Sequence, residues 1–137
     1  MSTVIDGTNA VLGRLAATVA ERLQKGEEIT IINAEKVIIT GNPNMVKKKW
    51  LQKYETGDPH HGPWWPKRPD LMLHRSIRGM MAYKKKTGRD ALKKLKVFMG
   101  TAGIDAAKTE KMTREIKTNF ITLGELATVV GGWKAEQ

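Results

Sequence analysis

The sequence has no cysteine among its 137 residues, and its only serines are Ser2 and Ser76. The absence of cysteine excludes disulfides, zinc–thiolate sites and thiol nucleophiles together. Neither serine lies in a nucleophile elbow, the Gly-x-Ser-x-Gly turn that exposes a catalytic hydroxyl. No nucleophile, base and orienting group can be assembled from recognisable spacing, so we predict no catalytic residue and a protein that is not an enzyme.

Long hydrophobic runs are also missing, since no apolar stretch approaches the roughly 20 residues of a membrane-spanning helix. The N-terminal MSTVIDGTNA has no basic segment followed by an apolar one, so we expect no signal peptide. These absences favour a cytoplasmic location and no membrane partner. With 40% hydrophobic residues and no internal repeat or linker, residues 1–137 are expected to form a single domain around one core.

Nucleotide and metal motifs are incomplete in this chain. TGNPNMVKK, residues 40–48, lies at an expected strand-to-helix turn, but it lacks the second glycine and the Lys-Ser/Thr ending of a phosphate loop. His60 and His61 could bind a metal with His74 or a nearby aspartate, but adjacent histidines without a second ligand pair rarely form a closed site. We therefore predict no metal, no cofactor and no small-molecule substrate, and we keep a nucleotide-dependent enzyme as an alternative.

Basic residues are abundant, and they are concentrated in one part of the chain. Residues 47–96 hold 15 Lys and Arg against 4 Asp and Glu, a net charge of +11, whereas the remaining 87 residues hold 9 basic and 10 acidic side chains. A contiguous block of this kind is typical of a polyanion-binding surface. The alternative is a charged face that is simply solvated, which is common for helix lysines.

One stretch of the basic block has an unusual composition. GDPHHGPWWPKRPD, residues 57–70, contains four prolines, two adjacent histidines and two adjacent tryptophans. Each proline fixes φ and disfavours helix in the residue before it, so we expect an extended arm that loses little entropy when it binds in a groove. The rings of Trp64 and Trp65 could stack on nucleotides, or at least one of them could pack back against its own domain.

The N-terminal third predicts ordinary α/β structure. A strand over residues 3–6 precedes a helix that we expect to run from Asn9 to Gln24 and to end at Gly26. The β-branched runs at 29–33 and 37–40 predict strands covered on both faces, as in a parallel sheet between helices. Their spacing leaves open whether the two strands pair with each other.

Helices are predicted for most of the remaining chain. Asn42 as cap and Pro43 at the first position begin a helix that reaches about Tyr54. Asp70 is expected to cap the next helix, whose apolar stripe would be Leu73, Ile77, Met80 and Met81. A short helix from about Arg89 and a strand over 97–99 follow, and TLGE at 122–125 forms a capping box that opens the last helix.

Several long motifs, in order along the chain, carry a resemblance to a known family. IINAEKVIITGN, HHGPWWPKRPD and RSIRGMMAYKKKTGRDALKKLKVFMG resemble the ribosomal protein L13 family of the large subunit, and VIDGTNAVLGRLAATVAERL resembles its N-terminal strand and helix. The resemblance covers about residues 3–100, and the chain length is more similar to the archaeal and eukaryotic branch. Where the family frequently has Phe-Phe-Pro, this chain has Trp64-Trp65-Pro66, which keeps the aromatic character.

The resemblance implies a three-layer α/β/α fold around a mostly parallel four-stranded sheet, here with the basic extended arm. It also implies a structural role in the large ribosomal subunit, with large-subunit ribosomal RNA and neighbouring ribosomal proteins as partners, and a part in early subunit assembly. A cytoplasmic location in the ribosome follows from that role. The alternative function is a free RNA-binding regulator of translation.

Within residues 47–96 we predict two kinds of RNA contact. Lysine and arginine neutralise phosphates, whereas flat rings stack on exposed bases. The predicted phosphate ligands are Lys47, Lys48, Lys53, Lys67, Arg68, Arg75, Arg78, Lys84, Lys85, Lys86, Arg89 and Lys93. The predicted stacking residues are His60, His61, Trp64 and Trp65.

Overall fold

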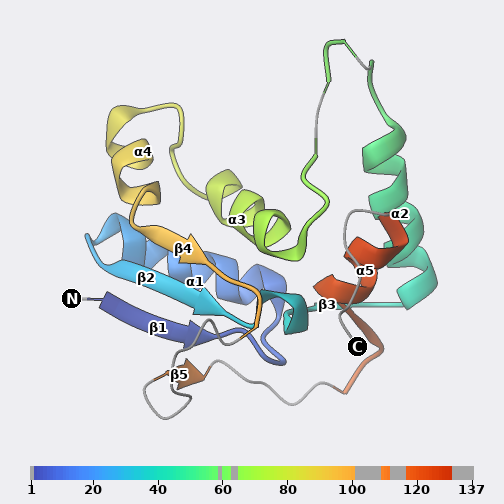
Figure 1. Ribbon diagram of the computed structural model, residues 1–137, viewed down its shortest axis with the longest axis horizontal. Coiled ribbons are helices and arrows are strands. Elements are labelled where there is room, and N and C mark those ends of the chain that lie inside the picture. The colour runs from blue at the N-terminus through green and yellow to red at the C-terminus, as the bar shows by residue number, and fades with distance from the viewer. Residues whose placement is uncertain (1, 59, 63–64, 101–108, 112–116, 131–137) are drawn as a thin grey trace.

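The computed structural model describes residues 2–58, 60–62, 65–100, 109–111 and 117–130 (Figure 1). Strands and helices alternate over residues 2–55, two further helices then precede the next strand, and one buried hydrophobic cluster joins these elements. No helix in these described ranges combines the length and the apolar character needed to cross a membrane.

A parallel sheet forms the left half of the molecule in Figure 1. β1 (Ser2–Asp6) pairs with β2 (Glu28–Ile32), and β2 pairs with β4 (Leu95–Val97), all in parallel. The two-residue β5 (Glu110–Lys111) adds a short parallel pairing at the other edge of β1. The predicted α/β class and its mostly parallel sheet are therefore confirmed.

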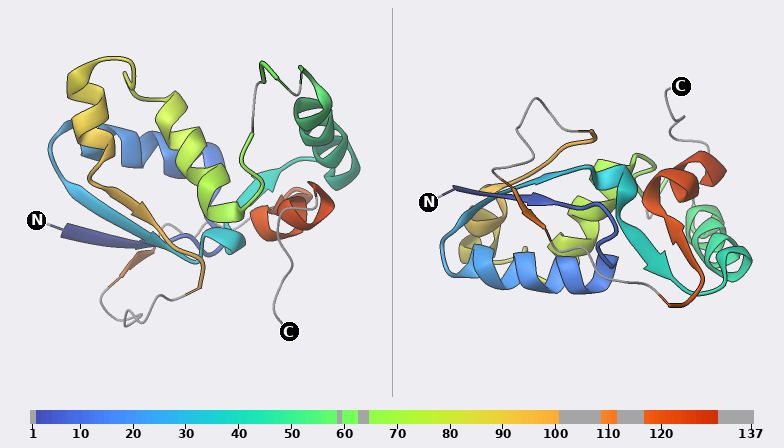
Figure 2. Two further views of the ribbon diagram at one scale, coloured as in Figure 1. Left: turned by 45° about the horizontal axis from the view of Figure 1, so that its top comes forward. Right: turned by 90° about the horizontal axis from the view of Figure 1, so that it is seen from below.

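The helices of this half lie on one side of the sheet (Figure 2). α1 (Leu12–Gln24) and α3 (Pro69–Gly79) contact each other, and their apolar residues share one buried cluster with Ile29 and Ile31. The neighbours Glu28 and Thr30 on the opposite face are not buried. β2 is therefore not covered on both faces along its length, and the described residues do not show the three-layer arrangement that the resemblance implied.

A second, separate sheet lies beside the first. β3 (Ile38–Thr40) pairs antiparallel with β6 (Phe120–Thr122), and α2 (Pro43–Glu55) and α5 (Leu123–Val130) pack around this pair. β2 and β3 do not pair with each other, because a 3-10 turn, η1 (Ala34–Lys36), redirects the chain between them. The pairing that the sequence left open is thus decided by the turn.

The helix start signals were right at two helices and wrong at two. The Asn42 side chain accepts a hydrogen bond from the backbone N–H of Asn44 at 3.0 Å, which confirms the cap of α2. The capping role of Thr122 is also confirmed, because its hydroxyl accepts a 3.2 Å hydrogen bond from the N–H of Glu125, which is one of the two bonds of a capping box. Asn9 instead has a positive φ of 57° in the turn that precedes α1, which begins only at Leu12.

α3 begins one residue before its predicted cap. Arg68 occupies the cap position and Pro69 the first position, so Asp70 lies in the first turn, where a carboxylate favours the helix dipole. The buried stripe is Met72, Leu73, Ile77 and Met81. Met80, predicted to face the core, is 47% exposed, whereas Met81 takes the buried position after the end of the helix.

The connection from α3 to β4 is compact. α4 (Lys86–Leu92) begins three residues earlier than the sequence predicted, and β4 covers 95–97 instead of 97–99. Gly88 lies against the preceding turn, where an added Cβ would come within 1.9 Å of the carbonyl oxygen of Ala82. Glycine is therefore required for this close approach of the helix to the backbone.

Candidate nucleic-acid interface

The chain goes out from α2 and returns to α3, and the described residues of this connection, 56–58, 60–62 and 65–68, are called the hairpin here (Figure 1). At its tip the N–H of Asp58 donates to the carbonyl of Gly62 at 3.1 Å, and the N–H of Gly62 donates back at 2.8 Å. Gly57 and Gly62 have positive φ values of 105° and 77°, which glycine adopts without strain. The segment is thus not the single extended arm that its prolines predicted, because this turn reverses the chain.

The tip of the hairpin is organised by Asp58. Its carboxylate accepts a 2.9 Å hydrogen bond from the backbone N–H of His60, and its other oxygen lies 3.3 Å from Nδ1 of His61. Both histidine side chains are exposed, His61 with 84% of its side-chain surface. Among the described residues, no group of three or more His, Asp or Glu side chains could hold a metal ion.

The base of the hairpin is fixed by aromatic and basic side chains. The Tyr54 hydroxyl donates a hydrogen bond to the carbonyl of Pro66. The guanidinium carbon of Arg75 lies 4.2 Å from the centre of a Trp65 ring, and Nζ of Lys53 lies 5.6 Å from it. Trp65 therefore packs back against α2 and α3, as one of the two sequence-based alternatives proposed. Trp64 lies outside the described residues.

Lys53 links two tryptophans. Its Nζ lies 4.4 Å from the Trp50 ring, in addition to its contact with Trp65. Burial, and secondly the charge of Lys49, lower the pKa of Lys53. An anion beside this lysine would favour its charged form.

Arg75 and Arg78 do not share one environment, although they lie one turn apart on α3. Arg75 contacts Trp65, whereas the guanidinium of Arg78 lies 4.5 Å from the ring centre of Tyr83. Nε of Arg78 is buried and has no hydrogen-bond partner within the described part of the chain. Burial lowers the pKa of His74, and the charge of Arg78 lowers it further, against an opposing effect of Asp70.

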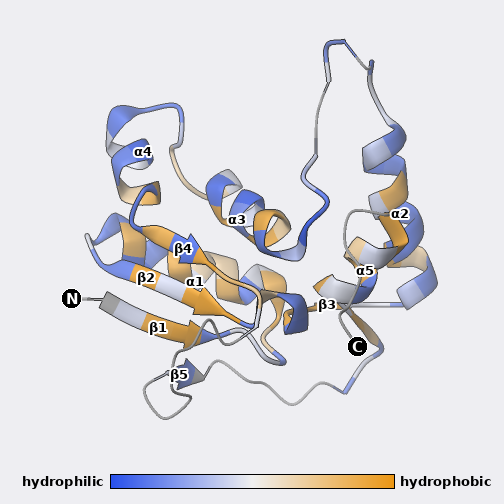
Figure 3. Ribbon diagram, viewed as in Figure 1, coloured by the Kyte–Doolittle hydropathy of each residue, from blue (hydrophilic) through white to orange (hydrophobic). Residues whose placement is uncertain are grey.

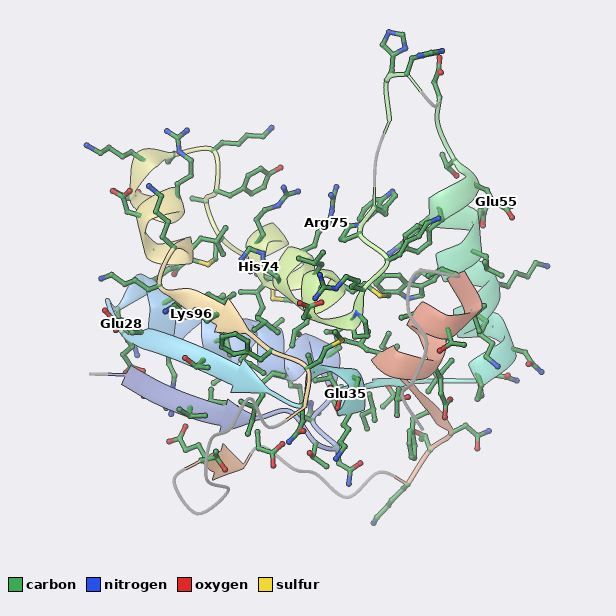
Figure 4. The ribbon with its side chains drawn as sticks, in the orientation of Figure 1. Glu28, Glu35, Glu55, His74, Arg75 and Lys96 are labelled. Carbon is green, nitrogen blue, oxygen red and sulfur yellow. The ribbon has the colours of Figure 1, made fainter. Side chains whose placement is uncertain are left out.

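The exposed predicted cations lie on α2, on the returning side of the hairpin and around α4. Figure 3 shows long hydrophilic stretches on these elements, and Figure 4 shows Arg75 projecting from α3 towards the side on which the hairpin rises. Lys47, Lys53, Arg75 and Arg78 are instead half-buried. The exposed members are Lys48, Lys67, Arg68, Lys84, Lys85, Lys86, Arg89 and Lys93.

Aromatic partners of the cations were missed by the sequence reasoning. Trp50, Tyr54 and Tyr83 were not named as site residues, although the rings of Trp50 and Tyr83 contact Lys53 and Arg78, and Tyr54 donates a hydrogen bond to Pro66. The spacing of Trp50 and Lys53, three residues apart on one helix, is the signal that could have indicated this pair. The contacts of Trp65 and Tyr83 involve different elements and have no such local signal.

Comparison with known proteins gives consistent matches over most of the chain. A family model described as ribosomal protein L13 matches residues 1–103, which include the hairpin, α3 and α4. The large ribosomal subunit protein uL13 of Methanopyrus kandleri is 48% identical over 137 residues, covering 94% of this chain and 86% of that protein. The protein of the same name from Methanocaldococcus jannaschii is 44% identical over 134 residues, covering 94% and 97%.

A third relative, the large ribosomal subunit protein uL13 of Archaeoglobus fulgidus, is 38% identical over 138 residues. That alignment covers 94% of this chain and 87% of the relative. The similarity therefore extends along nearly the whole chain in each of these pairs.

Proposed function

The chain belongs to the ribosomal protein L13 family, and from this premise we propose that it is a noncatalytic, RNA-binding structural component of the large ribosomal subunit in the cytoplasm. We propose large-subunit ribosomal RNA as its main partner, and neighbouring ribosomal proteins as further contacts. The proposed role includes supporting early assembly of the subunit. Residues 1–137 are proposed to act as one ribosomal protein domain.

The observation that carries this proposal is the placement of the positive charge. Residues 47–96, with a net charge of +11, supply the hairpin, α3 and α4, and most of the predicted cations on these elements are exposed. Cations gathered in this way attract and neutralise RNA phosphates. The relatives are named as proteins of the large ribosomal subunit. We propose that this chain is located in the same subunit, where the polyanion that it binds is ribosomal RNA.

The arrangement also supports a mechanism. The hairpin and α4 lie at opposite ends of α3 (Figure 1), so we propose that they bind different RNA segments and fix the position of one relative to the other. The contacts of Tyr54 and Trp65 at the base of the hairpin hold it in place before RNA binds, which reduces the entropy lost on binding. Most contacts are proposed to reach phosphates and RNA shape, and only a minority base edges.

The individual contacts follow from exposure. We propose phosphate binding for the exposed cations, and secondary phosphate contacts for the half-buried Lys47, Lys53, Arg75 and Arg78. His60 and His61 are proposed to contact nucleotides from the tip of the hairpin, where both side chains are exposed. Trp64 keeps its predicted stacking role, and Trp65 is proposed to contact a nucleotide at the base of the hairpin.

Cosedimentation tests the assignment to the ribosome. We expect the native protein to sediment with large subunits at high magnesium concentration. A native protein that stays in the light fractions would contradict the ribosomal role and favour the alternative, a free RNA-binding regulator of translation.

Salt titration tests the interface. Affinity for large-subunit ribosomal RNA should fall steeply with salt, with log K decreasing by about 0.7 to 0.9 per neutralised phosphate for each unit of log salt concentration. A flat salt response would show that the basic block is not the binding surface.

A further inference from the structure

A pocket of about 220 Å³ lies at the base of the hairpin, between α2 and α3. Trp50, Tyr54 and Trp65 supply aromatic walls, Lys53 and Arg75 supply two cations, and Gly79 leaves one side without a side chain. The volume is below the roughly 300–1,000 Å³ of pockets for drug-sized ligands, so the pocket suits a single ring system with a small substituent.

The chemistry of the lining limits the occupant. Aromatic rings and guanidinium planes stack on nucleobases, and lysine and arginine bind the attached phosphate. None of the described residues lining the pocket is acidic, so the local charge is positive. An anionic, flat ligand is therefore favoured over a cationic or purely aliphatic one.

We infer that this pocket receives one unpaired nucleotide of the bound RNA, with its base against the aromatic walls and its phosphate near Lys53 and Arg75. The inference rests on the proposed RNA-binding function and names a specific site for it. A base within a duplex remains stacked and paired, so only a nucleotide in a loop, bulge or single strand can enter.

The pocket is formed before any ligand binds. The hydrogen bond from Tyr54 to Pro66 and the stacking of Arg75 on Trp65 hold the hairpin side of the pocket against α2 and α3. A preformed site loses less entropy on binding than a mobile ring would. Burial and the charge of Lys49 lower the pKa of Lys53, and a nucleotide phosphate beside Lys53 would offset both effects.

Gly79→Leu fills the pocket without changing the charge. A Cβ added at Gly79 meets no atom within 4 Å, and the residue lies in α3 without a positive φ, so the variant should fold. The matched control is Gly13→Leu in α1, where an added Cβ also meets nothing within 4 Å. We expect Gly79→Leu to bind large-subunit ribosomal RNA about 5- to 150-fold more weakly, which corresponds to the loss of one stacked base. The salt slope should stay the same, because no phosphate contact is removed.

A direct measurement uses the indole N–H signals of Trp50 and Trp65 in the full-length protein, assigned with Trp50→Phe and Trp65→Phe. Single-stranded tetra-adenylate and tetra-uridylate should shift both signals in the wild type and in Gly13→Leu, but not in Gly79→Leu. A short adenylate–uridylate duplex should shift neither signal.

The inference is overturned if single strands leave both indole signals unchanged, or if Gly79→Leu binds the ribosomal RNA as tightly as the wild type. In either case, cosedimentation and a steep salt dependence would still support the proposed function. Loss of cosedimentation by the wild type would instead contradict the proposed function itself.

Discussion

Asn33 is a buried polar residue that organises the end of the parallel sheet. Its side-chain amide donates a 3.0 Å hydrogen bond to the carboxylate of Asp6, and its backbone N–H donates to the carbonyl of Gly100 at 2.8 Å. The same oxygen of Asp6 accepts bonds from the N–H and the hydroxyl of Thr8. Asn33 also has a φ of 56°, a left-handed conformation that asparagine tolerates better than most residues.

Asn33→Ala should therefore lower the free energy of unfolding by about 1–3 kcal/mol, because it removes a buried donor and places alanine in a left-handed conformation. Urea denaturation measures this loss. Asn44→Ala, at an exposed position of α2, is the control and should change stability by less than about 0.5 kcal/mol. Equal effects of the two variants would show that the Asn33 contacts contribute nothing.

His74 makes stability depend on pH. Its folded-state pKa is lowered, first by burial and then by Arg78, so the unfolded chain takes up a proton more readily than the folded one. The histidine therefore has no effect well above its ordinary pKa of roughly 6.5, and it destabilises the fold as the pH falls through that value towards the folded-state pKa.

His74→Gln should accordingly become more stable relative to the wild type when the pH is lowered from about 7.5 to about 5, a range that spans the ordinary histidine pKa. Melting temperatures at the two pH values measure this change. His60→Gln, at the exposed tip of the hairpin, is the control, and its melting temperature should change between the two pH values by the same amount as that of the wild type. A constant difference between His74→Gln and the wild type would contradict the assigned direction of the pKa shift.

At the scale of elements, α4 depends on the absence of one side chain. Gly88 is buried, and the turn before it is closed by a 3.0 Å hydrogen bond from the N–H of Lys85 to the carbonyl of Ala82, the same oxygen that an added Cβ would meet. The helix and the turn can only separate by moving backbone atoms. Neighbouring lysines of the turn and of α4 would move with them.

Gly88→Ala should lower the free energy of unfolding by about 1–3 kcal/mol or more through this overlap. Gly79→Ala is the matched control, because an added Cβ there meets nothing within 4 Å and alanine favours helix. Thermal unfolding of both variants measures the difference. A Gly88→Ala protein as stable as Gly79→Ala would show that the turn is free to shift.

The elements differ in how well local sequence predicted them. The start of α2 depends on Asn42 and Pro43, and the start of α5 on Thr122 and Glu125, so both were predicted from a few adjacent residues. The turn before α1 overrides the capping preference of Asn9, whose backbone N–H donates to the carbonyl of Lys36 at 3.2 Å. A contact with a distant segment therefore decided that boundary.

At the scale of the whole molecule, the positive charge is divided between α2 with the hairpin and the region around α4. If both groups bind phosphates, each should contribute separately to the salt dependence of RNA binding. Lys84, Lys85 and Lys86 are all exposed and adjacent, so they form the simplest group to remove.

Replacing these three lysines with glutamine should weaken RNA binding and lower the salt slope by about 0.7–0.9 for each phosphate that the variant no longer neutralises. Filter binding over a range of salt concentrations measures both quantities. Lys25→Gln is the control, since Lys25 lies outside the basic block and pairs with Glu21 at 3.1 Å. An unchanged salt slope in the triple variant would show that Lys84, Lys85 and Lys86 do not bind RNA phosphates.

Composition, local periodicity and ordered motifs were sufficient to predict the α/β class, the family and the concentration of basic residues at 47–96, because none of these depends on distant contacts. Prolines restrict only their own and the preceding residue, so they did not predict the turn between Asp58 and Gly62. That turn is itself local: the Asp58 carboxylate accepts a hydrogen bond from the N–H of His60, and Gly62 supplies a positive φ. Tertiary structure decided the packing at the base of the hairpin, because Arg75 from α3 covers the ring of Trp65 and no local pattern specifies a contact between distant elements.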